Sequence, residues 1–370
     1  MTASTFQSHN DQGGHHHHNL DCPAGKGEST VHASEQDHWN SFKAMHNADR
    51  PLDFYSYFDQ VTGKPAMQLL QQIGLVESVW PAGPTQLDSF QPDSRKALQE
   101  LLSRKAPDEK LNIMDAACGN GVVTKALLSA PDRPSSLQDG PKSIRVVAGD
   151  LSPAMIKRMD EMLVRQGWRG DSGETYDIVT RELDMVKYPE DLQSESFDLH
   201  LHTFGYFLLP DPDAALRETY RLLRPGGIIG HTTWASVGWA ETLGKVFQTL
   251  QAPPMAPIST IWKTRSDGKE SWEDAQWTKG KMEEIGFIDC HVSRCERLNV
   301  AESAESFADH LEEMGMLSTA TKLSNWDEQT KKEKGPLVKE AYIKQLKADA
   351  QDGKVGLTFV ALCFSGRKPL

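Results

Sequence analysis

Cysteine is scarce in this chain: its 370 residues include only five, and these are widely scattered. No two of them form a CxxC pair, and the spacing of Cys290 and Cys295 does not fit a zinc knuckle. A disulfide framework is excluded too, because it needs short spacings in a small secreted chain. We therefore expect reduced thiols, as in an intracellular protein.

Long apolar runs are absent as well. No run of eighteen apolar residues occurs, and the mean hydropathy is −0.52, so no membrane span is expected. The opening stretch MTASTFQSHNDQGG lacks the basic-then-apolar pattern of a secretory signal. The expected location is therefore the cytoplasm.

Positively charged residues are fewer than negatively charged ones. Lys and Arg number 40 against 52 Asp and Glu, which gives a formal net charge of −12 at pH 7. Such a balance argues against nucleic acid or an anionic membrane as the main partner. A small-molecule ligand is favoured, and because no dimerisation segment is recognisable we expect a monomer.

The chain changes character four times along its length. Residues 1–35 are polar and rich in Gly, His and Ser, which predicts a disordered tail. Residues 36–104 carry aromatic and apolar residues at helical spacing. From 105 to 300 short apolar strands alternate with amphipathic helices, which predicts a parallel sheet covered by helices on both faces. Residues 301–352 are helical, and 353–370 contain a last strand.

The most informative stretch is IMDAACGNGVVTKALL, at 113–128. An apolar strand ends near Asp115, a turn of small residues follows, and a helix begins. Small residues let a ligand approach the main chain closely, and the N–H groups of the turn point into a crevice at the positive end of the helix. Asp115 is placed to hold an ammonium group of that ligand.

Two more carboxylates follow the next two strands. Asp150 ends the second strand, where a carboxylate can accept hydrogen bonds from both hydroxyls of a ribose. Asp184 follows the third strand, where an adenine amino group would lie. Three acidic residues at successive strand ends predict a site for a nucleoside with an amino-acid tail. The alternative for Asp150 is a simple helix N-cap ahead of Pro153.

The ordered motifs DAACGNG, GDLSPAMI, ELDMVKYP and SFDLHLHTFGYFLLPDPDAALRETYRLLRPGG resemble those of the class I S-adenosylmethionine-dependent methyltransferases. They are most similar to the quinone-biosynthesis enzymes and the fungal small-molecule enzymes of secondary, or specialised, metabolism. The resemblance implies an α/β fold: a Rossmann-like, doubly wound, seven-stranded sheet with its last strand antiparallel. It further implies that 36–104 is an N-terminal helical lid, 105–300 the cofactor-binding core, 301–352 a helical insertion between strands six and seven over the acceptor site, and 353–370 the last strand.

The resemblance also assigns residues to S-adenosylmethionine and its product S-adenosylhomocysteine. The residues that would surround the methionine part are Asp115, Ala117, Cys118, Gly119 and Gly121. Those that would hold the ribose and adenine are Asp150, Leu151, Met155, Asp184 and Met185, while Thr203 and Phe204 would flank the methyl-transfer side. Two departures stand out: Ala117 replaces the first glycine of the family turn, and Phe207-Leu208 replaces paired histidines that many relatives carry.

Aromatic residues outside the nucleotide half predict an apolar acceptor pocket. The acceptor-binding candidates are Tyr55, Tyr57, Phe58, Phe207, Trp234 and Trp239; alternatively, these side chains pack the appended helices. The candidate catalytic residues are His202, Tyr206 and His231, with a structural role as the alternative for the histidines. No clustered carboxylates can be assigned near the acceptor, so no metal is expected.

The expected activity is methyl transfer by in-line displacement to a nitrogen, sulfur or oxygen atom of a small, hydrophobic or aromatic metabolite. Alignment and exclusion of water supply most of the catalysis in such a reaction, so a missing base does not argue against it. Two alternatives stay open: a non-methylating cyclase on the same scaffold, and a regulatory protein that keeps the fold. A dinucleotide site is disfavoured because A-C-G-N-G-V replaces GxGxxG. Nucleic-acid methylation is disfavoured because Thr203-Phe204-Gly205-Tyr206 stands in place of an Asn/Asp-Pro-Pro-aromatic motif.

Overall fold

The computed structural model describes residues 52–76, 92–131, 133, 137, 143–170, 176–254, 271–322 and 326–370. The tail expected at 1–35 lies outside these ranges. The backbone of Tyr55, Tyr57 and Phe58 belongs to a described helix, but their side chains lie outside the described part.

Seven strands form one sheet in the order β3-β2-β1-β4-β5-β7-β6. Their bounds are β1 Leu111–Ala116, β2 Ile144–Asp150, β3 Asp177–Glu182, β4 Phe197–Thr203, β5 Leu223–Val237, β6 Ile288–Ala301 and β7 Val355–Arg367. The pairs among β1 to β5 are parallel, whereas β7 is antiparallel to both β5 and β6. The predicted α/β, Rossmann-like sheet with an antiparallel last strand is confirmed. Strand order reverses between β1 and β4, which is where such sheets bind ligands.

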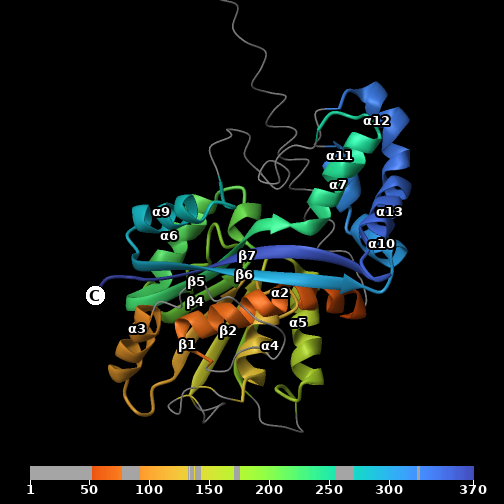
Figure 1. Cartoon of the computed structure of the whole chain (residues 1–370). Helices are drawn as coiled ribbons and strands as arrows, with labels where there is room; N and C mark the ends of the chain where they lie inside the picture. Colours follow the sequence, from red (N-terminus) through yellow and green to blue (C-terminus); the bar gives the residue numbers. More distant parts are fainter. Residues whose placement is uncertain are drawn as a thin grey trace, which may run out of the picture.

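Helices cover both faces of the sheet (Figure 1). One face carries α2 (Leu52–Ile73), α3 (Pro92–Ser103), α4 (Val122–Ser129) and α5 (Pro153–Arg165). The other carries α6 (Pro212–Leu222) and α9 (Ala275–Ile285), and the short 3-10 helix η3 (Tyr206–Leu208) follows β4. Because helices cover both faces, β4 is buried along almost its whole length, as its apolar sequence predicts.

The second half of α2 packs into the apolar core. Leu69 and Ile73 have no exposed surface. Two amides anchor the helix to the sheet: Gln68 Nε2 donates to Ser293 Oγ at 2.9 Å, and Gln72 Nε2 donates to Ser365 Oγ at 2.8 Å. Any lid function of 36–104 therefore belongs to residues before this half, and the lid stays a prediction.

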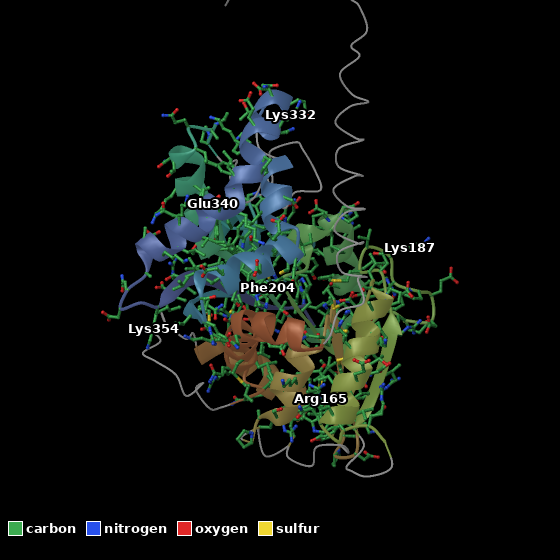
Figure 2. The ribbon with its side chains drawn as sticks, turned by 90° about the vertical axis from the view of Figure 1, so that its right-hand side faces the viewer. Arg165, Lys187, Phe204, Lys332, Glu340 and Lys354 are labelled. Atoms are coloured by element: carbon green, nitrogen blue, oxygen red, sulfur yellow. The ribbon has the colours of Figure 1, made fainter. Side chains whose placement is uncertain are left out.

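The described residues between β6 and β7 form four α-helices: α10 (Ala304–Glu313), α11 (Met316–Lys322), α12 (Glu328–Lys334) and α13 (Val338–Asp349), with the 3-10 helix η4 (Gly335–Leu337) before α13. With α7 (Gly238–Thr249) they build a second apolar cluster that includes Phe247, Phe307 and Tyr342. Figure 2 shows Phe204 between this helical group, marked by Lys332 and Glu340, and the layer of α2. That the insertion roofs an acceptor site stays a prediction.

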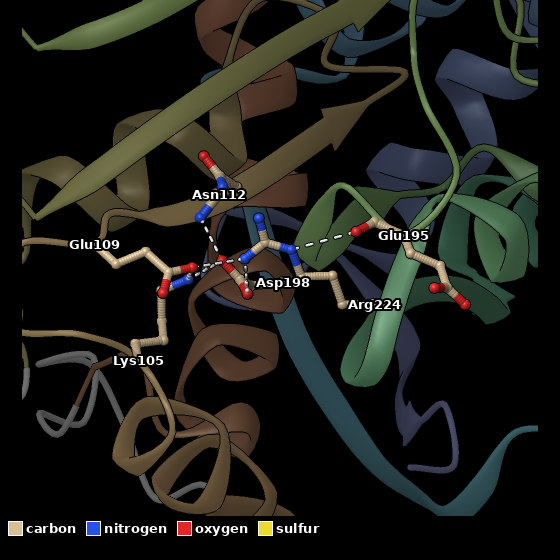
Figure 3. Close-up of polar contacts among 6 residues, drawn as sticks. All are labelled: Lys105, Glu109, Asn112, Glu195, Asp198 and Arg224. Carbon is tan, nitrogen blue, oxygen red and sulfur yellow. Dashed lines mark hydrogen bonds and ion pairs between the residues drawn. The ribbon is translucent and has the colours of Figure 1, made fainter.

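A buried carboxylate ties β1, β4 and β5 together (Figure 3). Asp198, at the start of β4, is 3% exposed. Its oxygens accept from Lys105 Nζ at 2.8 Å, from the backbone N–H of Asn112 at 2.7 Å and from Arg224 Nη1 at 3.2 Å. Arg224 also donates to Glu109 at 2.9 Å. This cluster lies at the edge opposite the strand ends that carry the candidate site.

Candidate active site

Asp115 is buried near the end of β1, with 1% of its surface exposed. Its Oδ2 accepts from Thr124 Oγ1 at 2.5 Å and from the Thr124 N–H at 3.2 Å. Its Oδ1 has no hydrogen-bond partner among the described residues. Burial raises the pKa of this carboxyl to about 7, against the lowering effect of the Thr124 bonds. A buried carboxylate oxygen that has no hydrogen-bond partner suits a cationic ligand group.

The turn after β1 is built from left-handed backbone. Ala117, Gly119 and Gly121 have φ values of 47°, 54° and 88°. A Cβ at Gly119 would meet nothing within 4 Å, so open space lies beside the main chain at that residue. A Cβ at Gly121 would lie 2.3 Å from Met159 Sδ, so glycine, which its φ also favours, lets the turn lie close to the methionines of α5. The two glycines thus differ: one has open space beside it, and the other lies against the methionines of α5.

Asp150 joins the ends of β1 and β2. Its Oδ2 accepts from the Gly119 N–H and its Oδ1 from the Ser152 N–H, both at 2.9 Å. Ser152, rather than Asp150, is the N-cap of α5, because its Oγ accepts from the Met155 N–H at 3.3 Å. The alternative of a helix cap for Asp150 is therefore wrong, and its carboxylate faces the turn.

A cleft of about 350 Å³ extends from this point past the end of β3. Its lining includes Leu151, Asp184, Lys187 and Tyr188. Asp184 is exposed, and its Oδ1 accepts from the Val186 N–H at 2.9 Å, which fixes the carboxylate at the cleft. Two other candidates point away from solvent: Met155 and Met185 are 5% and 4% exposed.

The chain turns sharply after β4. Phe204 has a φ of 58°, and its N–H donates to Thr232 O on β5 at 3.1 Å. Its ring stacks on Trp234, with centroids 3.9 Å apart and an interplanar angle of 12°. Thr203, next to it, is partly buried. An aromatic pair therefore lies at the ends of β4 and β5, beside the point where strand order reverses.

The three candidate bases have no exposed surface. His202 Nε2 accepts from the Tyr206 N–H at 3.1 Å, and the Tyr206 hydroxyl lies 2.7 Å from Thr219 Oγ1. His231 stacks on Phe364 with centroids 4.9 Å apart, and neither of its ring nitrogens has a partner among the described residues. Burial lowers the pKa of His231 to about 3 and holds that of His202 well below its usual value, while it raises the pKa of Tyr206. Their burial favours the structural alternative.

The acceptor-binding candidates are divided between core and site. Phe207 is 8% exposed and Trp239 is 3% exposed, and each belongs to an apolar cluster. Trp234 is partly buried and touches Phe359 of β7, with ring centroids 5.8 Å apart. Of the described candidates, Trp234 is the one that continues from Phe204 across the sheet.

The structure also brings in residues that the sequence did not indicate. Asp59 of α2 accepts from Asn120 Nδ2, inside the turn, at 2.7 Å and lies 3.9 Å from Lys125 Nζ. Burial raises the pKa of Asp59, against the lowering effects of Asn120 and Lys125. Gly205 is a second case: a Cβ there would lie 2.5 Å from His202 Cδ2 and 3.4 Å from Ala117 Cβ. A glycine after β4 was a visible signal, whereas nothing in the sequence marks Asp59.

The described cysteines are all free and buried: Cys118, Cys290, Cys295 and Cys363. Burial holds the pKa of the Cys118 thiol well above its usual value, so this side chain is not a thiolate nucleophile. Within the described ranges, no group of three His, Cys, Asp or Glu side chains is arranged to hold a metal ion. No helix in that part of the chain is both long and apolar enough to cross a membrane.

Comparison with known proteins identifies one domain of this chain. Residues 114–230, from Asp115's strand to the middle of β5, match the model of a methyltransferase domain. The chain therefore contains a methyltransferase domain, the kind of domain that its motifs resemble.

Two fungal relatives extend the similarity beyond that domain. Methyltransferase tpcH of Aspergillus fumigatus is 24% identical over 274 residues, which are 72% of this chain and 87% of the relative. Methyltransferase ktnA of Aspergillus niger is 25% identical over 223 residues, 56% of this chain and 71% of the relative. Among solved structures, phosphoethanolamine N-methyltransferase 2 of Haemonchus contortus with S-adenosyl-L-methionine has a TM-score of 0.37 at 16% identity. The match covers 86% of this chain and 60% of that protein's chain.

Proposed function

We propose that this enzyme methylates a nitrogen, sulfur or oxygen atom of a small, hydrophobic or aromatic compound of secondary metabolism. The observation that carries the proposal is the stacked pair Phe204 and Trp234, which lies at the ends of β4 and β5 next to the glycine turn of β1. Flat aromatic surface at that point suits a flat, apolar acceptor. The two Aspergillus relatives are both named methyltransferases, which supports methyl transfer.

The residues of the site fit S-adenosylmethionine. The vacant Oδ1 of Asp115 is available to the ammonium group, directly or through water. The open space at Gly119 admits the methionine part, and Asp150 lies where ribose hydroxyls would donate to it. Leu151 and Asp184 line the cleft that suits adenine. Ala117, Cys118 and Gly121 contribute backbone, because Cys118 is buried and Gly121 is closed by methionines.

When bound, the cofactor supplies a sulfonium methyl group that is already a good electrophile. The protein has to align the acceptor and exclude water. Phe204 is held rigidly for that task, because its N–H is bonded to Thr232 and its ring is stacked. Thr203 and Phe204 would flank the methyl group.

No general base is required from the three buried candidates. His202, Tyr206 and His231 shape the floor beneath the site through the bonds and stacks described above. An acceptor whose own pKa is low enough, such as an acidic phenol or a thiol, needs no base at neutral pH. We therefore propose that these three residues position Phe204 and the turn rather than exchange protons with the acceptor.

The test is a screen for acceptors by mass spectrometry. The purified enzyme is incubated with S-adenosylmethionine and a panel of polycyclic phenols, aromatic thiols and aromatic amines, together with aliphatic alcohols, thiols and amines of similar size. The expected result is a gain of one methyl mass by an aromatic compound, with S-adenosylhomocysteine formed in equal amount. Turnover of a compound without cofactor consumption would instead indicate a cyclase, and methylation confined to aliphatic compounds would contradict the aromatic assignment.

A further inference from the structure

Three side chains of β6 have a buried nitrogen without a hydrogen-bond partner among the described residues: His291, Arg297 and Asn299, of which the last two lie near one another. Asn299 is 4% exposed, and its Nδ2 has no partner among the described residues. Arg297 is partly buried, and its Nε likewise has none. Because side chains alternate along a strand, both lie on the face of β6 that carries Ser293, which is bonded to Gln68 of α2. The pair is therefore on the α2 face of the sheet.

An unpaired guanidinium nitrogen in such a place is costly. Burial of a charged or polar group without a partner destabilises the fold, and buried charges in proteins are paired. Nothing on the described part of the chain pairs with these two donors. Donors of this kind, one cationic and one neutral, suit a ligand oxygen with negative charge.

An aromatic row connects this pair to the methyl-transfer site. Phe204 stacks on Trp234 at 3.9 Å, and Trp234 lies 5.8 Å from Phe359. In the register of β6 with β7, Phe359 is the direct partner of Arg297. Trp234 pairs with Ala361, two residues from Phe359, so Trp234, Phe359 and Arg297 share one face.

The length of this row follows from the spacing of the strands that it crosses, and residues of α2 lie beside it. It crosses from β4 over β5 and β7 to β6, which are three strand spacings or about 14 Å. Val61 of α2 packs in the same apolar cluster as Phe359. Lys64 of α2 donates to Glu296 O at 3.0 Å, which brings a second positive charge to the same end.

We propose that Arg297 and Asn299 bind an oxyanion, such as a carboxylate, at the far end of an extended aromatic acceptor. The near end of that acceptor lies against Phe204, and its ring system lies along Trp234 and Phe359. The inference rests on the proposed function and defines its substrate class: a flat molecule of about three fused rings that carries an acidic group opposite the methylated atom.

The test uses anthracene-2-carboxylate as probe and anthracene-2-carboxamide as its neutral match. Binding of each to the protein saturated with S-adenosylhomocysteine is measured by calorimetry. The wild type is expected to bind the carboxylate at least about tenfold more tightly than the amide. Arg297→Met removes that preference, and Arg297→Lys keeps part of it. Arg294→Gln is the control, because Arg294 lies on the opposite face and pairs with Glu296 at 3.5 Å; it keeps the full preference.

Several outcomes overturn the inference. Equal affinity of wild type for both probes does so, as does no binding of the carboxylate, or a preference that survives Arg297→Met. Thermal melting identifies a variant that fails to fold, and Asn299→Leu, expected to weaken the preference several-fold, then provides the second variant. Saturation with S-adenosylhomocysteine is checked first: its failure contradicts the proposed function, whereas cofactor binding without carboxylate preference contradicts this inference alone.

Discussion

At the scale of single residues, the site contains strained backbone at two non-glycine positions. Ala117 and Phe204 both have positive φ, in a region that costs an L-residue roughly 1–2 kcal/mol. They follow β1 and β4, the two strands between which the order reverses. The strain at Phe204 is offset by its bonds to Thr232 and its stack on Trp234, whereas at Ala117 a single partly buried methyl group packs against the apolar core.

Ala117→Gly is therefore expected to stabilise the fold. Relief of the left-handed strain exceeds the entropy that glycine costs, and the net gain is about 0.5–1 kcal/mol in the free energy of unfolding. Urea denaturation measures it. Gly121→Ala is the opposite control and is expected to lose several kcal/mol, because its Cβ would overlap Met159. A loss of stability in Ala117→Gly contradicts the account.

The buried histidines make stability depend on pH. Burial lowers the pKa of His200 and of His231 to about 3 from 6.5. The unfolded chain therefore binds protons that the folded chain does not, and stability falls as pH decreases from about 6.5 towards 3. Asp115 acts in the opposite sense, because its raised pKa lets the folded chain hold an extra proton between about 7 and 3.8.

His231→Leu isolates one of these contributions. Neither nitrogen of His231 has a partner within the described residues, so the free energy of unfolding at pH 7 is expected to change by less than about 1 kcal/mol. Between pH 7 and pH 5 the wild type is expected to lose about 2 kcal/mol more than the variant. Denaturation curves at both pH values measure this difference, and parallel losses would contradict the buried neutral state of His231.

At the scale of elements, the two edges of the sheet perform different tasks. The edge with the carboxyl ends of the parallel strands carries Asp115, Asp150 and Phe204, while the opposite edge carries the cluster around Asp198 (Figure 3). Lys105, before β1, and Arg224, in β5, both donate to that carboxylate. The buried carboxylate thereby fixes β1, β4 and β5 relative to one another, and with them the strand ends that form the site.

Asp198→Asn is expected to destabilise the fold by about 3 kcal/mol, because Lys105 and Arg224 keep their charges without the buried partner. The matched control is Asp191→Asn, which removes a carboxylate that pairs with Arg181 while 63% of its side chain is exposed. Its expected cost is below about 1 kcal/mol. Both values come from urea denaturation; equal losses would show that burial of the pair is not what matters.

Elements could be predicted well where the apolar pattern is local. The strand and helix around the glycine turn, the alternation to β5 and the helices between β6 and β7 all follow from periodicity and turn residues. Contacts between residues that are far apart in the sequence could not be predicted. The partnership of Asp59 with Asn120 joins residues 61 positions apart, and the row from Phe204 to Arg297 depends on the register of β5, β7 and β6.

Burial was the other property that sequence left open. His202 and His231 look like candidate bases because they precede strand ends, but the helices on that face exclude them from solvent. In the same way, Trp239 and Phe207 pack inside apolar clusters, whereas Trp234 remains partly open. Which side chains reach a ligand depends on how the helices pack over the sheet. That packing cannot be predicted from the pattern of a single sequence.

At the scale of the whole molecule, the described residues form two apolar cores. One lies between the sheet and its helices, and the other joins α7 to the insertion of α10 to α13. The glycine turn belongs to the first core, and the pair Phe204 and Trp234 lies on the side where the second begins. Phe204 itself belongs to the first core and Trp234 packs against both, so the acceptor site that we propose lies where the two cores meet.

The most direct measurement is calorimetric titration of the whole protein with S-adenosylmethionine and S-adenosylhomocysteine, with Asp150→Ala alongside. The control is Asp177→Ala, because Asp177 lies at the start of β3, away from the strand ends that carry the candidate site, and pairs with Lys110 at 2.9 Å. The account predicts micromolar binding, about −8 kcal/mol, for wild type and control, and its loss in Asp150→Ala. Absence of binding to the wild type, or binding that survives Asp150→Ala unchanged, would contradict it.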